Sequence, residues 1–264
     1  MSCLPKEDFP LIEFGKLSNE ISIDSQILLN LLEKTKFAIS NVETRYFLNG
    51  IYFHKKTINN LDNLSLVATD GHRLAKINLP FSGGLIDIPG VIIPKKTVYE
   101  LGKLLADINE EIIINIDPNK IIFYIGNTTL ISKLIDGNFP DYERVIPKNN
   151  NMIVKTDRKN FCEAVDRVST ITSEKSRAIK FRVLKNLINM TSSDAENGTA
   201  TEDISVQYEG EEIEIGFNSK YLLEMINQLN EEKLLLEFSD STSPLIVKES
   251  SGNDLIYVLM PMRV

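Results

Sequence analysis

The sequence contains little cysteine, no tryptophan and no long hydrophobic run. Its two cysteines, Cys3 and Cys162, are far apart and form no C-x-x-C or Cys/His pattern, which argues against a disulfide framework and a zinc site. No stretch approaches the roughly twenty apolar residues that a membrane span needs, and the N-terminus has neither a basic start nor a hydrophobic signal core. We therefore expect a cytoplasmic protein.

Motifs of common enzyme families are also missing. The sequence has no G-x-S-x-G, H-E-x-x-H or P-loop pattern, and its only histidines are His54 and His72. Asp70 and His72 lie close together and could serve as acid and base in a hydrolase. Asp-Gly, however, is typical of a tight turn, so the segment predicts strand, turn and strand, with His72 on the rim of a hairpin. We expect no catalytic residue, no cofactor and no metal site, and keep the hydrolase as a remote alternative.

The chain repeats one order of elements. Its 264 residues suffice for two domains, and each half shows alternating runs typical of antiparallel strands between two amphipathic helices. In the first half we expect helices from an N-cap at Ser25 and after Pro94. In the second half we expect them from an N-cap at Asp157 and after Asn218. The pattern predicts an α+β fold of two similar domains, with two unrelated α+β domains as the alternative.

The segment NFPDYERVIPKNNN holds two prolines and an Asn run without periodicity, which is typical of a linker. We therefore expect domains at 19–147 and 148–264, with 1–18 left over from a preceding unit. Asn49-Gly50 resembles a hairpin turn, although a bulge within one strand is an alternative. The acidic run around Glu209–Glu214 alternates with apolar residues and predicts a strand with one solvated face rather than a metal site.

Basic charge is concentrated on the expected helices. The whole chain carries a net charge of −8, which argues against nucleic acid, yet the helical segments are net positive. An acidic body with a basic helical face suits weak, sequence-independent contact with a DNA backbone. The lysines singled out for this contact are Lys34, Lys95, Lys96 and Lys103. Lysine is also common on helices for solubility and helix propensity, and that alternative stays open.

The C-terminus, LIYVLMPMRV, ends on apolar and sulfur-containing residues. Methionine is flexible and polarisable, so this edge suits a pocket that accepts several different side chains. A last strand that simply ends in the core would explain Tyr257–Met260, but it explains Pro261–Val264 less well.

Several segments together resemble a known family. RYFLNGIYF, VATDGHRLA, KLIDGNFPDYERVIP, IGFNSKYL and VLMPMRV occur in the order seen in the bacterial DNA polymerase III β subunit, the sliding clamp, from about residue 9 to the end. The resemblance implies tandem DNA-clamp domains, each with antiparallel sheets outside and two helices on the inner face, around a hole for double-stranded DNA. It implies tethering of the DNA polymerase III catalytic subunit, and binding of the clamp loader and of other polymerases and repair proteins, through short peptides.

The resemblance also assigns residues. A peptide pocket between the two domains would be formed by Leu48, Thr69, Gly71, His72, Arg73, Leu74, Pro140, Arg144, Val145, Asn218, Tyr221, Val258, Met260, Pro261, Met262 and Arg263. Arg45 and Tyr46 resemble a loop that touches DNA. Ser176, Pro244 and Val264 depart from the family pattern, so peptide preference is expected to differ.

The family has three domains per chain and forms a homodimeric ring. Residues 1–18 resemble the end of the first domain, so the resemblance implies that this domain is absent here, through a shortened chain or a split gene. One hypothesis is a clamp part that binds partner peptides but cannot encircle DNA. The other is that three copies supply the six domains of a ring.

Overall fold

The computed structural model describes residues 5, 19–81, 88–173, 177–252 and 254–263. The predicted remnant at 1–18, Ser176 and Val264 therefore lie outside the described residues. The first half contains β1 (Asn19–Asp24), α1 (Ser25–Lys36), η2 (Glu43–Leu48, a 3₁₀ helix), β2 (Gly50–Ile58), β3 (Leu61–Thr69), β4 (Arg73–Pro80), β5 (Val91–Pro94), α2 (Lys95–Leu105), β6 (Glu111–Asp117), β7 (Lys120–Ile125) and β8 (Thr128–Lys133).

The second half repeats this order of strands and helices. It contains β9 (Met152–Asp157), α3 (Arg158–Ser169), β10 (Ala178–Leu184), β11 (Leu187–Asp194), β12 (Gly198–Ser205), β13 (Ile213–Asn218), α4 (Ser219–Ile226), β14 (Lys233–Phe238), β15 (Leu245–Glu249) and β16 (Leu255–Leu259). A linker with one 3₁₀ turn, η3 (Tyr142–Val145), joins the halves. The predicted α+β fold of antiparallel sheets and few helices is confirmed.

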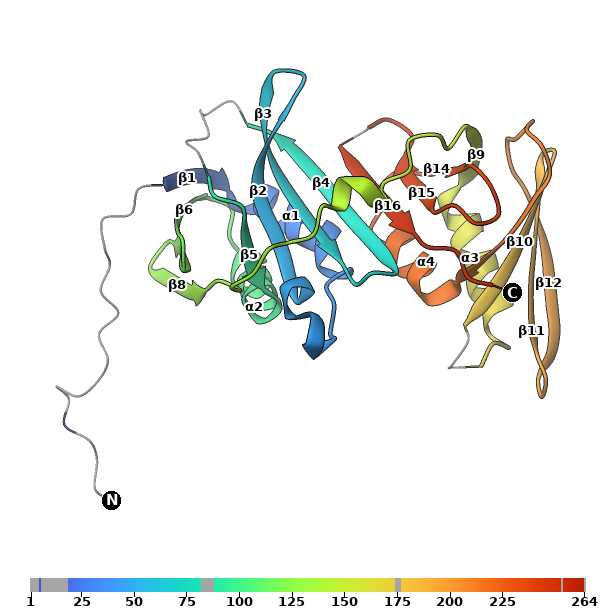
Figure 1. Ribbon diagram of the computed structural model, residues 1–264, viewed down its shortest axis with the longest axis horizontal. Helices are drawn as coiled ribbons and strands as arrows, with labels where there is room; N and C mark the ends of the chain where they lie inside the picture. Colours follow the sequence, from blue (N-terminus) through green and yellow to red (C-terminus); the bar gives the residue numbers. More distant parts are fainter. Residues whose placement is uncertain (1–4, 6–18, 82–87, 174–176, 253, 264) are drawn as a thin grey trace.

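The two halves share one sheet. The order β5-β2-β3-β4 in the first half continues through β16-β15-β14-β9 of the second, giving eight strands. The junction is the antiparallel pair β4–β16, with Leu255 opposite Ile77 and Leu259 opposite Arg73. We call this pair the seam. Two four-stranded sheets, β1-β6-β7-β8 and β12-β11-β10-β13, complete the halves (Figure 1).

Three helix starts were predicted correctly and one was shifted. The helix α2 begins at Lys95, directly after Pro94. Asp157 caps α3 through the Asn160 amide, and Asn218 caps α4 through the amides of Lys220 and Tyr221. The predicted N-cap at Ser25 is wrong by one residue. Asp24 accepts from the amides of Gln26 and Ile27, while Ser25 is buried as the first helical residue.

The predicted turn at Asn49-Gly50 is also wrong. The chain passes there from the 3₁₀ helix η2 directly into β2, so the two residues form neither a hairpin turn nor a bulge. Gly50 is nevertheless required, because a Cβ at this position would lie 2.2 Å from the carbonyl oxygen of Ile93 on β5.

The shared sheet has a helix side and a linker side. On the helix side α1 contacts β2, β3 and β4, and Leu66, Ala75 and Tyr257 join the main core. On the opposite side Val67, Leu74 and Val258 form a smaller cluster under Tyr142 of the linker. Figure 1 shows the linker crossing in front of β2, β3 and β4, with α1 behind them.

The linker is held on the sheet by a hydrogen bond between two rings and by ion pairs. The Tyr142 hydroxyl and His54 Nε2 form the hydrogen bond, at 3.0 Å. Beside it, the Glu143 carboxylate binds Lys56 of β2 and Lys76 of β4. Burial alone would raise the pKa of Glu143, but the hydrogen bonds from the two lysines outweigh burial and lower the pKa to about 2.

We expect Glu143→Gln to lower the free energy of unfolding at pH 7 by at most about 1 kcal/mol, because solvent screens this partly exposed group. The folded-state pKa lies below the ordinary value of 4.5, so the stabilisation is present above pH 4.5 and is lost as the pH falls towards 2. Urea unfolding at pH 7 and at pH 3 measures it: the gap between parent and variant should shrink at pH 3. An equal gap at both pH values would contradict the assignment, and the exposed Glu209→Gln is the control.

Candidate functional site

The β3–β4 turn stands at one end of the seam. Gly71 adopts a φ of +89°, which favours glycine, and Asp70 Oδ1 accepts from the amides of His72 (2.9 Å) and Arg73 (3.1 Å). Thr69 Oγ1 donates to the Arg73 carbonyl at 2.7 Å. The predicted strand, turn and strand is therefore confirmed, with His72 exposed at its rim.

Arg73 joins the two halves at this turn. Its guanidinium binds Asp70 of its own turn, Glu224 of α4 and the carbonyl of Phe37 after α1 (2.7 Å for the last). It also lies 4.4 Å from the centre of the Tyr221 ring. Only 8% of Arg73 is exposed, and its charge is compensated by Asp70 and Glu224.

The C-terminal residues continue beyond the last strand. β16 ends at Leu259, after which the Met260 amide donates to the His72 carbonyl at 2.9 Å. The Met262 amide then donates to the Gly216 carbonyl of β13 at 2.8 Å. The terminal segment therefore runs from the β3–β4 turn to β13, and 41% of Met260 is exposed. The turn and the terminal methionines, predicted to meet, are adjacent.

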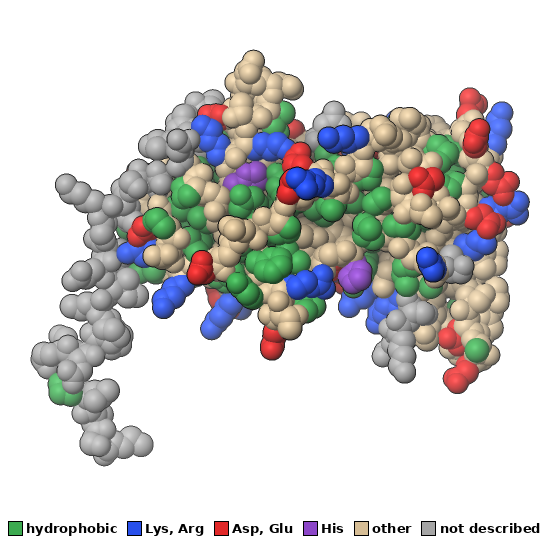
Figure 2. All heavy atoms as spheres, viewed as in Figure 1, with side chains coloured by type: hydrophobic (Ala, Val, Ile, Leu, Met, Phe, Trp, Pro, Cys, Tyr) green, Lys and Arg blue, Asp and Glu red, His purple; other side chains and the backbone are tan. Residues whose placement is uncertain are grey.

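An apolar surface lies on the linker side of the seam. Its floor is the buried pair Leu74 and Val258, which face each other across β4 and β16. Exposed linker residues Pro140, Arg144 and Val145 adjoin it, since the intervening Tyr142 packs on that floor. We call Leu74, Val258, Met260 and these three linker residues the linker-side surface. Arg144 binds only Asp141 among the described residues, at 2.7 Å. Figure 2 shows hydrophobic side chains gathered across the middle of this face.

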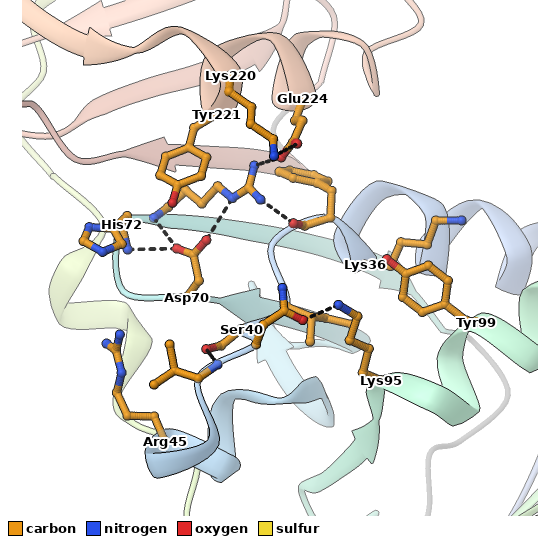
Figure 3. A pocket seen from close by; sticks show the side chains of 15 residues that line it. Lys36, Ser40, Arg45, Asp70, His72, Lys95, Tyr99, Lys220, Tyr221 and Glu224 are labelled. Atoms are coloured by element: carbon orange, nitrogen blue, oxygen red, sulfur yellow. Dashed lines mark hydrogen bonds and ion pairs between the residues drawn. The ribbon is translucent and has the colours of Figure 1, made fainter. Parts of the chain in front are cut away.

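A cavity of about 610 Å³ opens on the other side of the turn. It lies between η2, the end of α1, the start of α2 and α4 (Figure 3). Its lining includes five predicted residues, which are Arg45, His72, Arg73, Lys95 and Tyr221. The His72 and Tyr221 rings stack with centroids 6.2 Å apart. The predicted pocket residues are thus divided between the linker side and this cavity.

The remaining predicted residues take various positions. Leu48 is buried, Asn218 is committed as the cap of α4, and Pro261 is half-buried while Arg263 is exposed. Tyr46 is exposed and packs edge-on against Phe47. Pro244, which departs from the family pattern, accepts through its carbonyl from the Asn150 side chain at 2.9 Å.

The lysines predicted to face DNA differ in how far they are exposed to solvent. Lys96 is exposed, Lys103 is exposed beside Glu100 (3.0 Å), and Lys95 binds Asn41. The prediction for Lys34 needs correction. It is only 5% exposed and binds the Gln228 carbonyl, with Glu249 at 3.7 Å, so it contributes to the contact between the halves. Burial lowers its pKa, partly offset by Glu249.

Acid–base catalysis by Asp70 and His72 is not supported by this geometry. The Asp70 carboxylate is occupied by the His72 and Arg73 amides and the Arg73 side chain. The other histidine, His54, has a pKa lowered mainly by burial. Across the described part of the chain, no cluster of three or more His, Cys, Asp or Glu side chains could hold a metal, and no helix could span a membrane.

Sequence reasoning missed several residues of the site. Phe37 and Glu224 complete the Arg73 contacts, and Tyr142 covers the linker-side floor. Tyr142 stands within the linker segment, where an aromatic residue between two prolines was the available signal.

Comparisons with known proteins point to one family over nearly the whole chain. Residues 22–141 match the central domain, and residues 143–263 the C-terminal domain, of the DNA polymerase III beta subunit. The beta sliding clamp of Caulobacter vibrioides is 44% identical over 261 residues, which cover 99% of this chain and 70% of that protein. The Escherichia coli clamp is 34% identical over 264 residues, 100% of this chain and 71% of that protein.

Solved clamps have the same fold. A sliding clamp from Bartonella birtlesii bound to griselimycin superimposes with a TM-score of 0.95 at 42% identity, covering 99% of this chain and 70% of that one. The chain belongs to the DNA polymerase III β subunit family, the bacterial sliding clamps. This confirms the predicted family, and membership of a family of non-catalytic processivity factors confirms that the chain is not an enzyme.

Arg73→Ala should lower the free energy of unfolding by about 3 kcal/mol, because it leaves Asp70 and Glu224 without their buried partner. Arg73→Lys should recover only part of this loss, since lysine cannot bind several acceptors in one plane. Urea unfolding measures both. Arg144→Ala, which removes an exposed arginine, is the matched control and should change stability by less than about 0.5 kcal/mol. Equal effects of the two alanine changes would contradict the role given to Arg73.

Proposed function

We propose that this clamp chain tethers a DNA polymerase to duplex DNA by binding a short peptide of the polymerase on the linker-side surface. The clamp loader, other polymerases and repair proteins would use the same surface. The observation that carries the proposal is the exposed Met260 held at the seam by the His72 carbonyl, beside the apolar floor.

The chemistry of the surface suits a peptide. An apolar floor with a flexible methionine edge can accept different hydrophobic side chains. Arg144 is exposed at the rim and retains donors for backbone carbonyls or a carboxylate, since Asp141 contacts its guanidinium at Nε. Short linear peptides commonly bind such preformed grooves.

The helix side of the molecule suits duplex DNA. Lys95 and Lys96 at the start of α2, Lys103 farther along it and Arg45 of η2 lie on neighbouring elements. Figure 2 shows lysine and arginine side chains gathered along the rim that α2, η2 and α4 form in Figure 1. Cations of this kind bind phosphates without reading bases, which permits sliding. We expect the full-length protein to form a homodimeric ring and to act in the cytoplasm.

Met260→Ala should weaken binding of a labelled clamp-binding peptide from a DNA polymerase about tenfold, because an exposed apolar anchor is removed without disturbing the core. Fluorescence anisotropy titration measures the change, and Arg144→Ala should weaken binding in the same assay.

Leu61→Ala is the matched control. Leu61 is 64% exposed and lies at the opposite end of β3 from the turn, so its truncation should leave peptide affinity unchanged. Unchanged affinity in both Met260→Ala and Arg144→Ala would contradict the assignment of the surface.

For DNA, Lys96→Gln should reduce the slope of log affinity against log salt concentration by about one, the effect of losing one phosphate contact. Lys180→Gln is the control, because β10 places Lys180 on the sheet face opposite the core residue Phe181 and α3. Filter binding of a long duplex across a salt series measures both slopes. A slope that responds equally to the two changes would argue against a helix-side DNA surface.

A further inference from the structure

A second cavity, of about 510 Å³, lies between the two halves at the end of the seam farthest from the β3–β4 turn. The first half contributes the start of α1 and the end of β4 to it, and the second half contributes Asn230 after α4 and the segment from β15 to β16. Its volume is typical of small-ligand sites, which span roughly 300–1,000 Å³. Its described lining includes none of the residues predicted for the peptide pocket. The cavity is therefore separate from both the linker-side surface and the cavity at the turn.

Much of the wall of this second cavity is aliphatic. Ile27 and Leu31 stand one turn apart on α1, and Leu79 of β4 and Leu255 of β16 complete this part of the lining. Leu31 and Leu255 are buried, whereas 43% of Ile27 is exposed. An exposed isoleucine beside buried leucines offers apolar area whose burial by a ligand would be favourable.

The polar part of the lining contains a buried lysine with a spare donor. Lys34 is only 5% exposed, and its ammonium binds the Gln228 carbonyl and lies 3.7 Å from Glu249 Oε1. An ammonium has three N–H donors, so at least one N–H of Lys34 has no acceptor among the described residues. Glu249 Oε1 also accepts from the Asn230 amide at 2.6 Å, while Glu249 Oε2 has no partner in the part of the chain that the structure describes. The cavity thus offers a donor beside an acceptor.

The charges of the lining favour a neutral ligand. One cation, Lys34, and two carboxylates, Glu249 and Asp254, stand among the described lining residues. A ligand carboxylate would be repelled by the two carboxylates, and a ligand ammonium would meet the charge of Lys34. An amide group suits both side chains, because its carbonyl accepts from Lys34 while its N–H donates to Glu249 Oε2. The oxygen and nitrogen of one amide lie roughly 2.3 Å apart, so a single amide can span these two neighbouring side chains.

We propose that this cavity binds an aliphatic amide, which is the chemistry of an apolar peptide residue together with its peptide bond. The aliphatic group would lie on Ile27 and Leu31, and the amide would bridge Lys34 and Glu249. Because the ligand would touch both halves at once, its binding would also stabilise the junction between them. The site lies at the opposite end of the seam from Met260, so it does not depend on the proposed tethering function.

The test compares two probes that share one aliphatic body, isocaproamide and isocaproate. Each is titrated into the full chain at pH 7, and binding is followed by saturation-transfer NMR. The amide should bind about tenfold more tightly than the carboxylate, because only the amide satisfies Lys34 and Glu249 together. Equal affinities, or no saturable binding of isocaproamide up to its solubility limit, overturn the proposal.

Two variants test whether the probe binds in this cavity. Ile27→Ser removes the exposed part of the aliphatic wall and should weaken isocaproamide binding about tenfold. Lys34→Met removes the donor and should weaken it by a similar factor, with the fold of the variant checked by circular dichroism.

Ile153→Ser is the matched control, because Ile153 is 49% exposed on β9 and does not line the cavity. Its affinity for isocaproamide should equal that of the parent. If Ile27→Ser binds the probe as tightly as Ile153→Ser, the proposal is overturned whatever the outcome for Lys34→Met. The peptide titration with Met260→Ala concerns a different surface, so this site and the tethering function can fail independently.

Discussion

The hydrogen-bonded pairing of β4 with β16 is the interaction on which the rest of the structure depends. It places Arg73–Ile77 opposite Leu255–Leu259 and makes two halves into one eight-stranded sheet. Because side chains alternate across a strand, a slip of β16 by one residue against β4 would move Val258 to the helix side and Tyr257 to the linker side. Both the linker-side surface and the cavity beneath the turn require this one register.

Polar contacts across the junction restrict that register further. Arg73 reaches Glu224 of α4, and Lys34 of α1 reaches the Gln228 carbonyl, while Tyr257 Oη donates to the Lys34 carbonyl at 3.0 Å. Arg73, Lys34 and Tyr257 are buried, so a shift of one half against the other would leave their polar groups without these partners. The halves are thus joined by directional bonds as well as by apolar contact, which favours a fixed angle between them.

Local signals predicted local structure well. Asp157 as a helix cap, the helix start after Asn218, the Asp-Gly turn and the alternating strands were all predicted because each depends on neighbouring residues. Contacts between residues far apart in the sequence could not be predicted from these local signals. Charge counting treated Lys34 as solvated, since nothing local indicates that the other half covers it. The ion pair of Arg73 with Glu224 of α4 was missed for the same reason. Asn49-Gly50 misled because the preceding 3₁₀ helix, and not a strand, brings the chain to β2.

The route of the linker has a consequence for simultaneous occupancy. The linker crosses the sheet on the face opposite α1, so the sheet itself separates what lies on its two sides. Val145 of the linker and the helix α2 therefore lie on opposite sides of the shared sheet. If peptide and DNA bind as proposed, they occupy opposite sides of this sheet, and exchange on one side need not wait for departure from the other.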